Sequence, residues 1–292
     1  MPNPSFFPDF QHQKIQTSEA EINLVIGGDG PPLLLLHGYP QNHVMWHKVA
    51  PTLAKYFTVV ATDLRGYGDS SKPKTDATHF SYSKRAMAKD QVEVMEKLGF
   101  DQFRVLAHDR GARVAHRMSL DFPEKVEKLV LLDILPTLWL YDHTDQAFAT
   151  NYWHWFFLIQ PHPVPETLIS NSADFMEKAI FTTLLAKGAC TYETVATYCR
   201  TFKDAAILHA SCEDYRAGAT IDLVHDRADF SARIQCPLLV LWGGQNPAYQ
   251  GKDVLKIWGE KAINVQGQSV DSGHFIAEEV PTEMLELVLA FL

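Results

Sequence analysis

Short apolar runs recur along the chain and alternate with longer stretches in which apolar residues return every three or four positions. Short continuous runs are typical of parallel strands that are buried on both faces. Five such runs span residues 33–36, 58–61, 103–106, 128–132 and 238–242. The longer stretches, residues 82–98, 111–121 and 281–292, predict helices that lie against the faces of a sheet.

The alternation stops after residue 132 and resumes only at Cys236. Residues 136–222 between these points are aromatic and helical in pattern and contain no run that reads as a strand. The chain is therefore predicted to be an α/β protein with a mostly parallel, doubly wound sheet and an inserted helical cap. Residues 1–135 would form the first part of the core, residues 136–222 the cap, and residues 223–292 the second part of the core.

Composition and charge narrow the classes of partner and the location. The 292 residues carry a formal net charge of -9 without a basic stripe, so nucleic acid is not an expected partner, and an anionic substrate would need local arginines. The stretch 1–11 lacks a basic segment followed by an apolar one, and no run approaches the roughly 20 apolar residues of a membrane span. The four cysteines show no Cys-x-x-Cys spacing. A cytoplasmic protein without membrane contact and without a cofactor is expected.

One predicted strand runs directly into a predicted helix through a turn of small residues. Asp109 stands in this turn, with Ala107 two positions before it and Gly111 two positions after it. Such spacing is typical of a nucleophile elbow, a sharp turn that exposes the central side chain above the sheet. Since Asp also caps helix N-termini, two interpretations remain open at this point, a carboxylate nucleophile and a helix cap.

Two arginines follow in the first turn of the same helix, where the helix dipole disfavours positive charge. Arg110 and Arg113 therefore require a nearby anion. Asp109 could be that anion in an ion-pair cluster, but residues three apart share a helix face and could together bind the carboxylate of a substrate. We favour the substrate carboxylate, because guanidinium groups bind carboxylates through paired hydrogen bonds.

A histidine and a second acid complete the candidate site. His274 lies in a small-residue loop before the last predicted helix, and it follows the nucleophile and the acid in the chain order found with nucleophile elbows. Asp133 follows the predicted strand 128–132 directly. The alternative acid position, after the strand 238–242, carries Asn246, and an amide cannot stabilise an imidazolium as a carboxylate does. The acid of a complete triad is therefore expected to be Asp133.

The loop after the first buried run lies on the other side of the predicted nucleophile. It reads His37-Gly38-Tyr39-Pro40. The backbone N–H groups of Tyr39 and Arg110 are expected to stabilise an oxyanion that forms beside the nucleophile.

Several motifs together resemble the α/β-hydrolase superfamily over nearly the whole chain. They are His37-Gly-Tyr-Pro40, Asp63-Leu-Arg-Gly-Tyr-Gly-Asp-Ser-Ser-Lys-Pro73, His108-Asp-Arg-Gly111 and Ser272-Gly-His274. Within that superfamily the chain is similar to the fluoroacetate dehalogenases. That similarity rests on His108-Asp-Arg-Gly-Ala-Arg113, Leu132-Asp-Ile-Leu-Pro-Thr137, Tyr152-Trp-His-Trp-Phe-Phe157 and Cys212-Glu-Asp-Tyr-Arg216.

The resemblance implies a reaction and a role for each matching residue. Asp109 would displace fluoride from fluoroacetate and form an aspartyl ester, which water activated by His274 and Asp133 would hydrolyse to glycolate. The remaining roles are Arg110 and Arg113 on the substrate carboxylate and His154, Trp155 and Tyr215 on the halide. Members of the family tend to be homodimers, so a homodimer is expected.

Other functions remain as alternatives. An epoxide hydrolase would use the same triad, with Tyr152 and Tyr215 as acids toward the epoxide oxygen, but paired arginines do not suit a neutral epoxide. An esterase would need a serine at position 109. A ligand-binding protein on the same fold would have no reason to keep a complete triad. His43 and His47, four positions apart, suggest a metal site, but no third ligand is evident near them.

Overall fold

A single sheet of eight strands forms the centre of the molecule in the computed structural model, which describes residues 6–292. The strands are β1 (Gln11–Gln16), β2 (Glu21–Gly27), β3 (Pro32–Leu36), β4 (Thr58–Thr62), β5 (Phe103–His108), β6 (Val126–Leu132), β7 (Leu238–Gly243) and β8 (Val265–Val270). Their order across the sheet is β1-β2-β4-β3-β5-β6-β7-β8. β1 pairs with β2 and β2 with β4 in antiparallel fashion, and every other pair is parallel.

The central strands are buried on both faces. In β3 all four leucines, Leu33 to Leu36, are inaccessible to solvent, and the end of β6 from Leu129 to Leu132 is equally enclosed. Burying one leucine side chain stabilises a fold by roughly 1.5–3 kcal/mol. Consecutive leucines are all buried only where helices cover both faces of the sheet, so these runs lie in its middle. The apolar runs identified in the sequence are the strands β3, β4, β5, β6 and β7.

Helices flank both faces of this mostly parallel sheet, which confirms the predicted fold class. They are α1 (Ala50–Leu53), α2 (Lys84–Lys97), α3 (Asp109–Asp121), α13 (Val254–Gly259), α14 (Ile276–Glu279) and α15 (Pro281–Phe291), with short 3-10 helices η1 (His43–Trp46), η2 (Phe80–Tyr82) and η3 (Pro247–Tyr249). α3 packs on β5 and β6 and against α2. The predicted helices 82–98, 111–121 and 281–292 correspond to α2, α3 and α15, with ends that differ by at most two residues.

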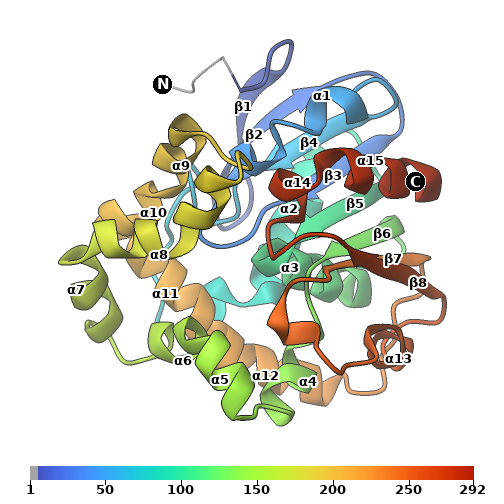
Figure 1. The fold of residues 1–292 in the computed structure, drawn as a ribbon. Coiled ribbons are helices and arrows are strands. Elements are labelled where there is room, and N and C mark those ends of the chain that lie inside the picture. Colours follow the sequence, from blue (N-terminus) through green and yellow to red (C-terminus); the bar gives the residue numbers. More distant parts are fainter. Residues whose placement is uncertain (1–5) are drawn as a thin grey trace.

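Nine helices lie between β6 and β7 within the described chain, and we call them the helical insert. They are α4 (Thr137–Asp142), α5 (Gln146–Asn151), α6 (Trp153–Leu158), α7 (Val164–Ser170), α8 (Ala173–Ala186), α9 (Tyr192–Tyr198), α10 (Arg200–Lys203), α11 (Ala205–Ala219) and α12 (Ile221–Ala228). Figure 1 shows the insert as one body beside the sheet, coloured from yellow-green to orange. The predicted cap limit at residue 222 falls inside α12.

Three strands escaped the sequence pattern, namely β1, β2 and β8. β1 and β8 are the two edges of the sheet, and their residues alternate between exposed and half-buried, so they lack a continuous apolar run. Within residues 6–292 no helix combines the length and the apolarity needed to cross a bilayer. Of the N-terminal stretch 1–11 considered above, residues 1–5 lie outside the described part of the chain.

Candidate active site

The turn between β5 and α3 places Asp109 above the carboxyl end of the parallel strands. His108 ends β5 in extended conformation, and Asp109 begins α3 with φ of 45°, a left-handed conformation that a non-glycine residue adopts at some cost. Gly111 lies against the neighbouring strand, and a Cβ there would stand 2.4 Å from the carbonyl oxygen of His37. Gly38 is as tightly placed, since its Cβ would be 2.5 Å from that of Asp109. The small residues of both loops are therefore required by the close approach of the two backbones.

The carboxylate of Asp109 is buried and ionised. Its Oδ1 accepts a hydrogen bond of 3.0 Å from the backbone N–H of Tyr39, the predicted oxyanion donor. Burial alone would raise the pKa of Asp109, but the positive charges of His274, Arg110 and Arg113 lower this pKa to about 2. The N-terminus of α3 stabilises the negative charge further. The backbone N–H of Arg110 lies in the first turn of that helix, where such groups have no intrahelical acceptor.

His274 and Asp133 stand beside the nucleophile in the geometry of a catalytic triad. Nδ1 of His274 lies 2.5 Å from Oδ2 of Asp133, and its Nε2 lies 3.9 Å from Oδ2 of Asp109. Burial acts to lower the pKa of His274, but the hydrogen bond to Asp133 and the two carboxylate charges raise it above its ordinary value. The two acids thus hold the imidazole in place and favour its protonated form.

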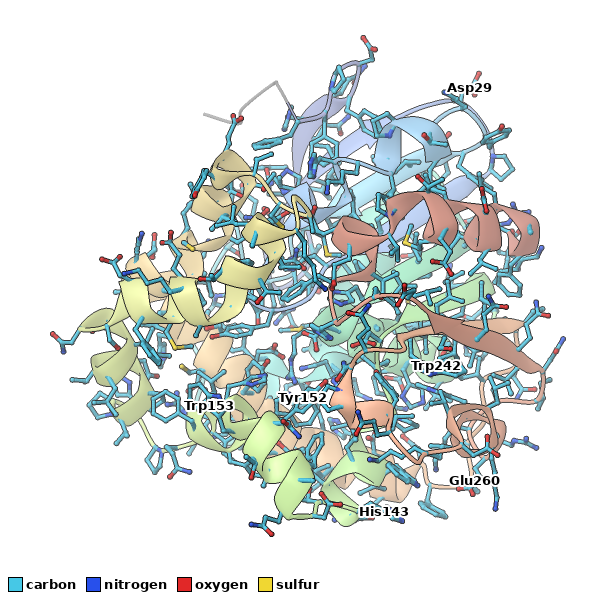
Figure 2. All side chains as sticks on the ribbon, in the orientation of Figure 1. Asp29, His143, Tyr152, Trp153, Trp242 and Glu260 are labelled. Atoms are coloured by element: carbon cyan, nitrogen blue, oxygen red, sulfur yellow. The ribbon has the colours of Figure 1, made fainter. Side chains whose placement is uncertain are left out.

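Asn246 lies at the alternative acid position after β7 and supports Asp133, the acid of the triad. Its Nδ2 donates to Oδ2 of Asp133 at 2.7 Å, while the backbone N–H of Gly243 donates to Oδ1 at 2.8 Å. Asn246 also exchanges hydrogen bonds of 2.9 and 3.0 Å with the hydroxyl of Tyr152. Figure 2 shows Tyr152 where the insert meets the end of the sheet. Sequence reasoning considered Asn246 only as a missing acid and overlooked this supporting role.

The two arginines of α3 have different surroundings. Arg110 is fully paired with Asp214 of α11, with 2.8 Å between Nε and Oδ2 and 2.9 Å between Nη2 and Oδ1. Asp214 also accepts hydrogen bonds from Tyr67 at 2.8 Å and from Lys84. The anion that compensates the guanidinium of Arg110 is therefore Asp214 of the insert, more than one hundred residues further along the chain, and not the substrate carboxylate or Asp109 that the sequence suggested.

Arg113, by contrast, has no carboxylate within ion-pair distance among residues 6–292. Its Nη1 donates to the carbonyl oxygen of Leu135 at 3.1 Å and to Thr137 at 2.9 Å, and its Nε is buried without a partner. The guanidinium lies 4.5 Å above the ring of Trp155. Burial and the neighbouring Arg110 lower the pKa of Arg113, which is what an uncompensated buried cation experiences. The charge of Asp109 acts on this cation only from beyond ion-pair distance.

A cavity of about 380 Å³ opens between the insert and the strand ends and reaches Asp109 and His274. A small extension of about 10 Å³ continues from Asp109 to Arg113 and Trp155, enough for a group the size of one water molecule. The wall opposite Asp109 carries His154 and Tyr215. The residues of the predicted site, except Arg110, thus line one or both of these two spaces, some from the sheet and some from the insert.

Three side chains near Asp109 offer hydrogen-bond donors that have no acceptor within the described chain. The indole N–H of Trp155, the hydroxyl of Tyr215 and the ring nitrogens of His154 form no hydrogen bond within the described chain, and none of these atoms is wholly buried. Burial lowers the pKa of His154 to about 4 and raises that of Tyr215 well above its ordinary value. Both side chains are therefore neutral near pH 7, and each keeps an N–H or O–H proton to donate.

The pair His43 and His47 does not form a metal site. Nδ1 of His43 is 2.8 Å from Asp63, and Nδ1 of His47 is 2.9 Å from the carbonyl oxygen of Val44, so the two rings bind different neighbours. The one cluster of possible metal ligands found among residues 6–292 lies elsewhere and does not contain them.

The sequence of this chain is similar to those of known hydrolases. A family model described as the alpha/beta hydrolase fold matches residues 31–281. A fluoroacetate dehalogenase from Burkholderia sp is 42% identical over 288 residues, which are 98% of this chain and 95% of that protein. A soluble epoxide hydrolase from Corynebacterium sp. (strain C12) is 33% identical over 288 residues, 97% of each chain.

Solved structures agree on the fold, and one of them is an epoxide hydrolase. A crystal structure from Nostoc sp PCC 7120, provisionally described as an alpha/beta hydrolase, superimposes with a TM-score of 0.93 at 55% identity over 98% of both chains. The epoxide hydrolase CorEH superimposes with a TM-score of 0.87 at 31% identity, covering 97% of this chain and 98% of that one. The two activities must therefore be weighed on the residues of this cavity.

Proposed function

The chain belongs to the α/β-hydrolase family, and from that premise we propose that it hydrolyses the carbon–halogen bond of a small 2-haloacid such as fluoroacetate, releasing glycolate and fluoride. The observation that carries the proposal is an ionised Asp109 near three donors that have no acceptor and near a cation, Arg113, that has no carboxylate at ion-pair distance within the described chain. A carboxylate with a leaving halide supplies both missing partners. A neutral epoxide supplies no anion for Arg113.

The first step is a displacement at the carbon that bears the halogen. Oδ2 of Asp109 attacks this carbon, a C–O bond forms, and fluoride departs with the electron pair of the C–F bond. Oδ1, held by the N–H of Tyr39, becomes the carbonyl oxygen of the ester. No proton has to be removed from the nucleophile, since the carboxylate is already ionised.

Fluoride is a poor leaving group because its charge is concentrated on a small atom. His154, Trp155 and Tyr215 would bind this charge more strongly as it develops than they bind the halogen on carbon, and such differential binding accelerates the step. Arg113 would hold the substrate carboxylate and so direct the carbon toward Asp109. The guanidinium of Arg110 is occupied by Asp214. Arg110 would therefore contribute to substrate binding only through its charge, and to the oxyanion through its backbone N–H.

The second step hydrolyses the ester. His274, oriented by Asp133, takes a proton from a water that attacks the ester carbonyl, and Oδ1 becomes the oxyanion that the N–H groups of Tyr39 and Arg110 stabilise. Collapse of this intermediate expels glycolate and restores the carboxylate of Asp109. Forming the ester removes the charge of Asp109, one of the groups that raise the pKa of His274, so the base loses its proton more readily when it is needed.

Epoxide hydrolysis is the second candidate, because relatives with that activity share the fold and the triad can serve both reactions. It would need Tyr152 and Tyr215 to donate protons to the epoxide oxygen. The hydroxyl of Tyr215 is available, but that of Tyr152 is engaged with Asn246. The cavity thus presents one free tyrosine where that mechanism uses two, which favours the dehalogenase.

The experiment measures free fluoride and glycolate from fluoroacetate, with chloroacetate and an aromatic epoxide assayed in parallel. Fluoride release supports the proposal, and diol from the epoxide without halide release would replace it by the second candidate. A single turnover in heavy-oxygen water adds a test of the route. The proposed ester places the label in the carboxylate of Asp109, whereas direct attack of water on the substrate places it in glycolate.

A further inference from the structure

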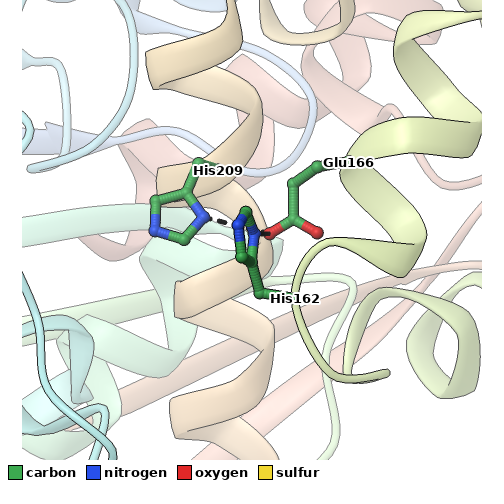
Figure 3. Close-up of side chains that lie close together, drawn as sticks. All are labelled: His162, Glu166 and His209. Atoms are coloured by element: carbon green, nitrogen blue, oxygen red, sulfur yellow. Dashed lines mark hydrogen bonds and ion pairs between the residues drawn. The ribbon is translucent and has the colours of Figure 1, made fainter.

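Outside the active-site cavity, two histidines of the insert lie within 3.2 Å of one carboxylate oxygen of a glutamate. His162 lies just before α7, Glu166 lies in α7, and His209 lies in α11. Nδ1 of His162 is 3.2 Å from Oε1 of Glu166, and Nδ1 of His209 is 3.0 Å from the same oxygen. Figure 3 shows the rings of His162 and His209 on the same side of the Glu166 carboxylate, His209 from α11 and His162 from the residues before α7.

The charges around the cluster leave one negative charge uncompensated. Arg216 lies between two carboxylates, with its Nη1 2.8 Å from Glu166 and 2.6 Å from Glu213. His79 faces the other oxygen of Glu213 at 2.6 Å. Burial acts to raise the pKa of Glu166, but the hydrogen bonds from Arg216 and His209 lower it to about 2. Apart from its histidines, the group therefore has two carboxylates and one guanidinium, so its charges can accommodate a further cation.

Two of the three separations between the ligand atoms fit a single metal ion. The three ligand atoms lie within 4.8 Å of one another. With metal–nitrogen bonds of about 2.0–2.1 Å, neighbouring ligands of a tetrahedral ion are about 3.3 Å apart, close to the separations from Glu166 to the two histidines. Two imidazoles with one carboxylate form a donor set that suits zinc, nickel and copper and not magnesium.

We propose that His162, Glu166 and His209 bind a divalent first-row transition metal ion, with Zn²⁺ as the reference case. The side chains of His162 and His209 are 61% and 44% exposed, so water can enter and complete the coordination. Arg216 binds both oxygens of Glu166, at 2.8 Å from Nη1 to Oε1 and 3.1 Å from Nη2 to Oε2, and so would orient the carboxylate while Oε1 shares its second lone pair with the metal. Hydrogen bonds of this kind fix the orientation of ligating carboxylates.

A metal at this position would connect two parts of the insert that are distant in sequence. It would fix the start of α7 to α11, the helix that also carries Tyr215 of the active-site cavity. Because the ion binds only the folded arrangement, it should stabilise the insert by an amount that grows with the logarithm of its concentration above the dissociation constant. This inference does not depend on the dehalogenase proposal, since none of the three ligands lines that cavity.

The competing explanation is a set of ordinary hydrogen bonds in which each histidine donates its Nδ1 proton to Glu166. Calorimetric titration of the full, metal-stripped chain with zinc chloride separates the two. The wild type is expected to bind one more zinc ion per chain than His162→Ala or His209→Ala, and His143→Ala serves as the matched control. His143 is an exposed histidine of the same insert whose ring stacks on Trp139, outside the cluster (Figure 2).

Equal zinc stoichiometry in the wild type and both cluster variants would overturn the proposal, because any binding would then belong to other groups. Saturating zinc should also raise the unfolding midpoint of the wild type and of His143→Ala by about 2 °C or more, and leave those of the cluster variants unchanged. Magnesium should do neither. Should an alanine variant fold poorly, His162→Asn and His209→Gln at these exposed positions repeat the comparison, and retention of the extra zinc ion in both would reject the site.

Discussion

Arg113 offers the sharpest test of the proposed substrate, because it is the buried cation of the cavity for which the described chain supplies no carboxylate. Replacing it with methionine keeps the length and apolar volume of the side chain and removes the charge. We expect Arg113→Met to fold and to lose the ability to use an anionic haloacid efficiently. The substitution leaves the triad of Asp109, Asp133 and His274 untouched.

The magnitude follows from the contacts that are lost. A hydrogen bond to a charged group contributes about 1.5–3 kcal/mol, so losing the interaction with the substrate carboxylate should lower kcat/KM for chloroacetate or fluoroacetate about 10- to 150-fold. In the free protein the substitution removes two hydrogen bonds, to Leu135 and Thr137, and also removes an uncompensated buried charge. These effects oppose each other, so the free energy of unfolding should change by less than about 2 kcal/mol.

Arg110→Met is the matched comparison. It leaves Asp214 with Lys84 and Tyr67 alone, and breaking a buried pair of this kind costs about 3–5 kcal/mol. It also removes the guanidinium that lies 4.1 Å above the ring of Tyr215. The two variants should therefore separate, with Arg113→Met impaired mainly in substrate use and Arg110→Met mainly in stability.

The assay compares chloroacetate with chloroacetamide, a neutral molecule of the same size, in the wild type and both variants. Denaturant unfolding measures the stability of each protein in parallel. The reasoning predicts that Arg113→Met loses activity on chloroacetate and not on chloroacetamide. It would be refuted by equal losses on both compounds, or by full activity of Arg113→Met on the acid.

Three further predictions test the triad and the halide donors. Asp109→Asn should abolish turnover, whereas His274→Asn should form the ester once and stop, so that mass spectrometry finds the chain heavier by one carboxymethyl group; continued turnover in either variant contradicts the assigned roles. Asp133 and Asp109 raise the pKa of His274 above 6.5 in the free protein, and the ester removes the charge of Asp109, so ester hydrolysis, and turnover where this step limits it, should increase with pH through a midpoint below the pKa of His274 in the free protein. Stopped-flow and steady-state pH profiles measure both, and a profile that is flat around neutral pH argues against His274 as the base. Trp155→Phe removes one N–H donor and should lower kcat for fluoroacetate by roughly 10-fold or more, with a smaller effect on chloroacetate, whose leaving group has the more diffuse charge; equal effects on the two substrates would remove Trp155 from the halide site.

Much of the fold could be predicted because the central strands are enclosed on both faces and therefore need continuous apolar runs. β3 is the clearest case, with four consecutive leucines. The edge strands β1 and β8 could not be predicted, since their exposed faces tolerate polar residues such as Gln13 and Gln268. The homodimer and the cytoplasmic location stay predictions.

The candidate site divides in the same way. Asp109 could be found from its own neighbours, because the tight turn leaves a local signature of small residues. The pairing of Arg110 with Asp214 could not, because it depends on how a distant helix of the insert packs on α3. Arg110 has a carboxylate partner and Arg113 has none within ion-pair distance in the described chain. This difference depends on the folded neighbours of each guanidinium and leaves no mark in the sequence.

The nucleophile and base lie on the sheet, while the three free donors come from one continuous stretch between β6 and β7. The chemistry and the choice of leaving group are therefore encoded in separate parts of the gene. A library that varies the cavity residues of that stretch should keep Asp214, which pairs with Arg110, and Tyr152, which binds Asn246 beside Asp133. Related chains with a common core can in this way diverge between halides and epoxides through their inserts, and an engineer can follow the same route.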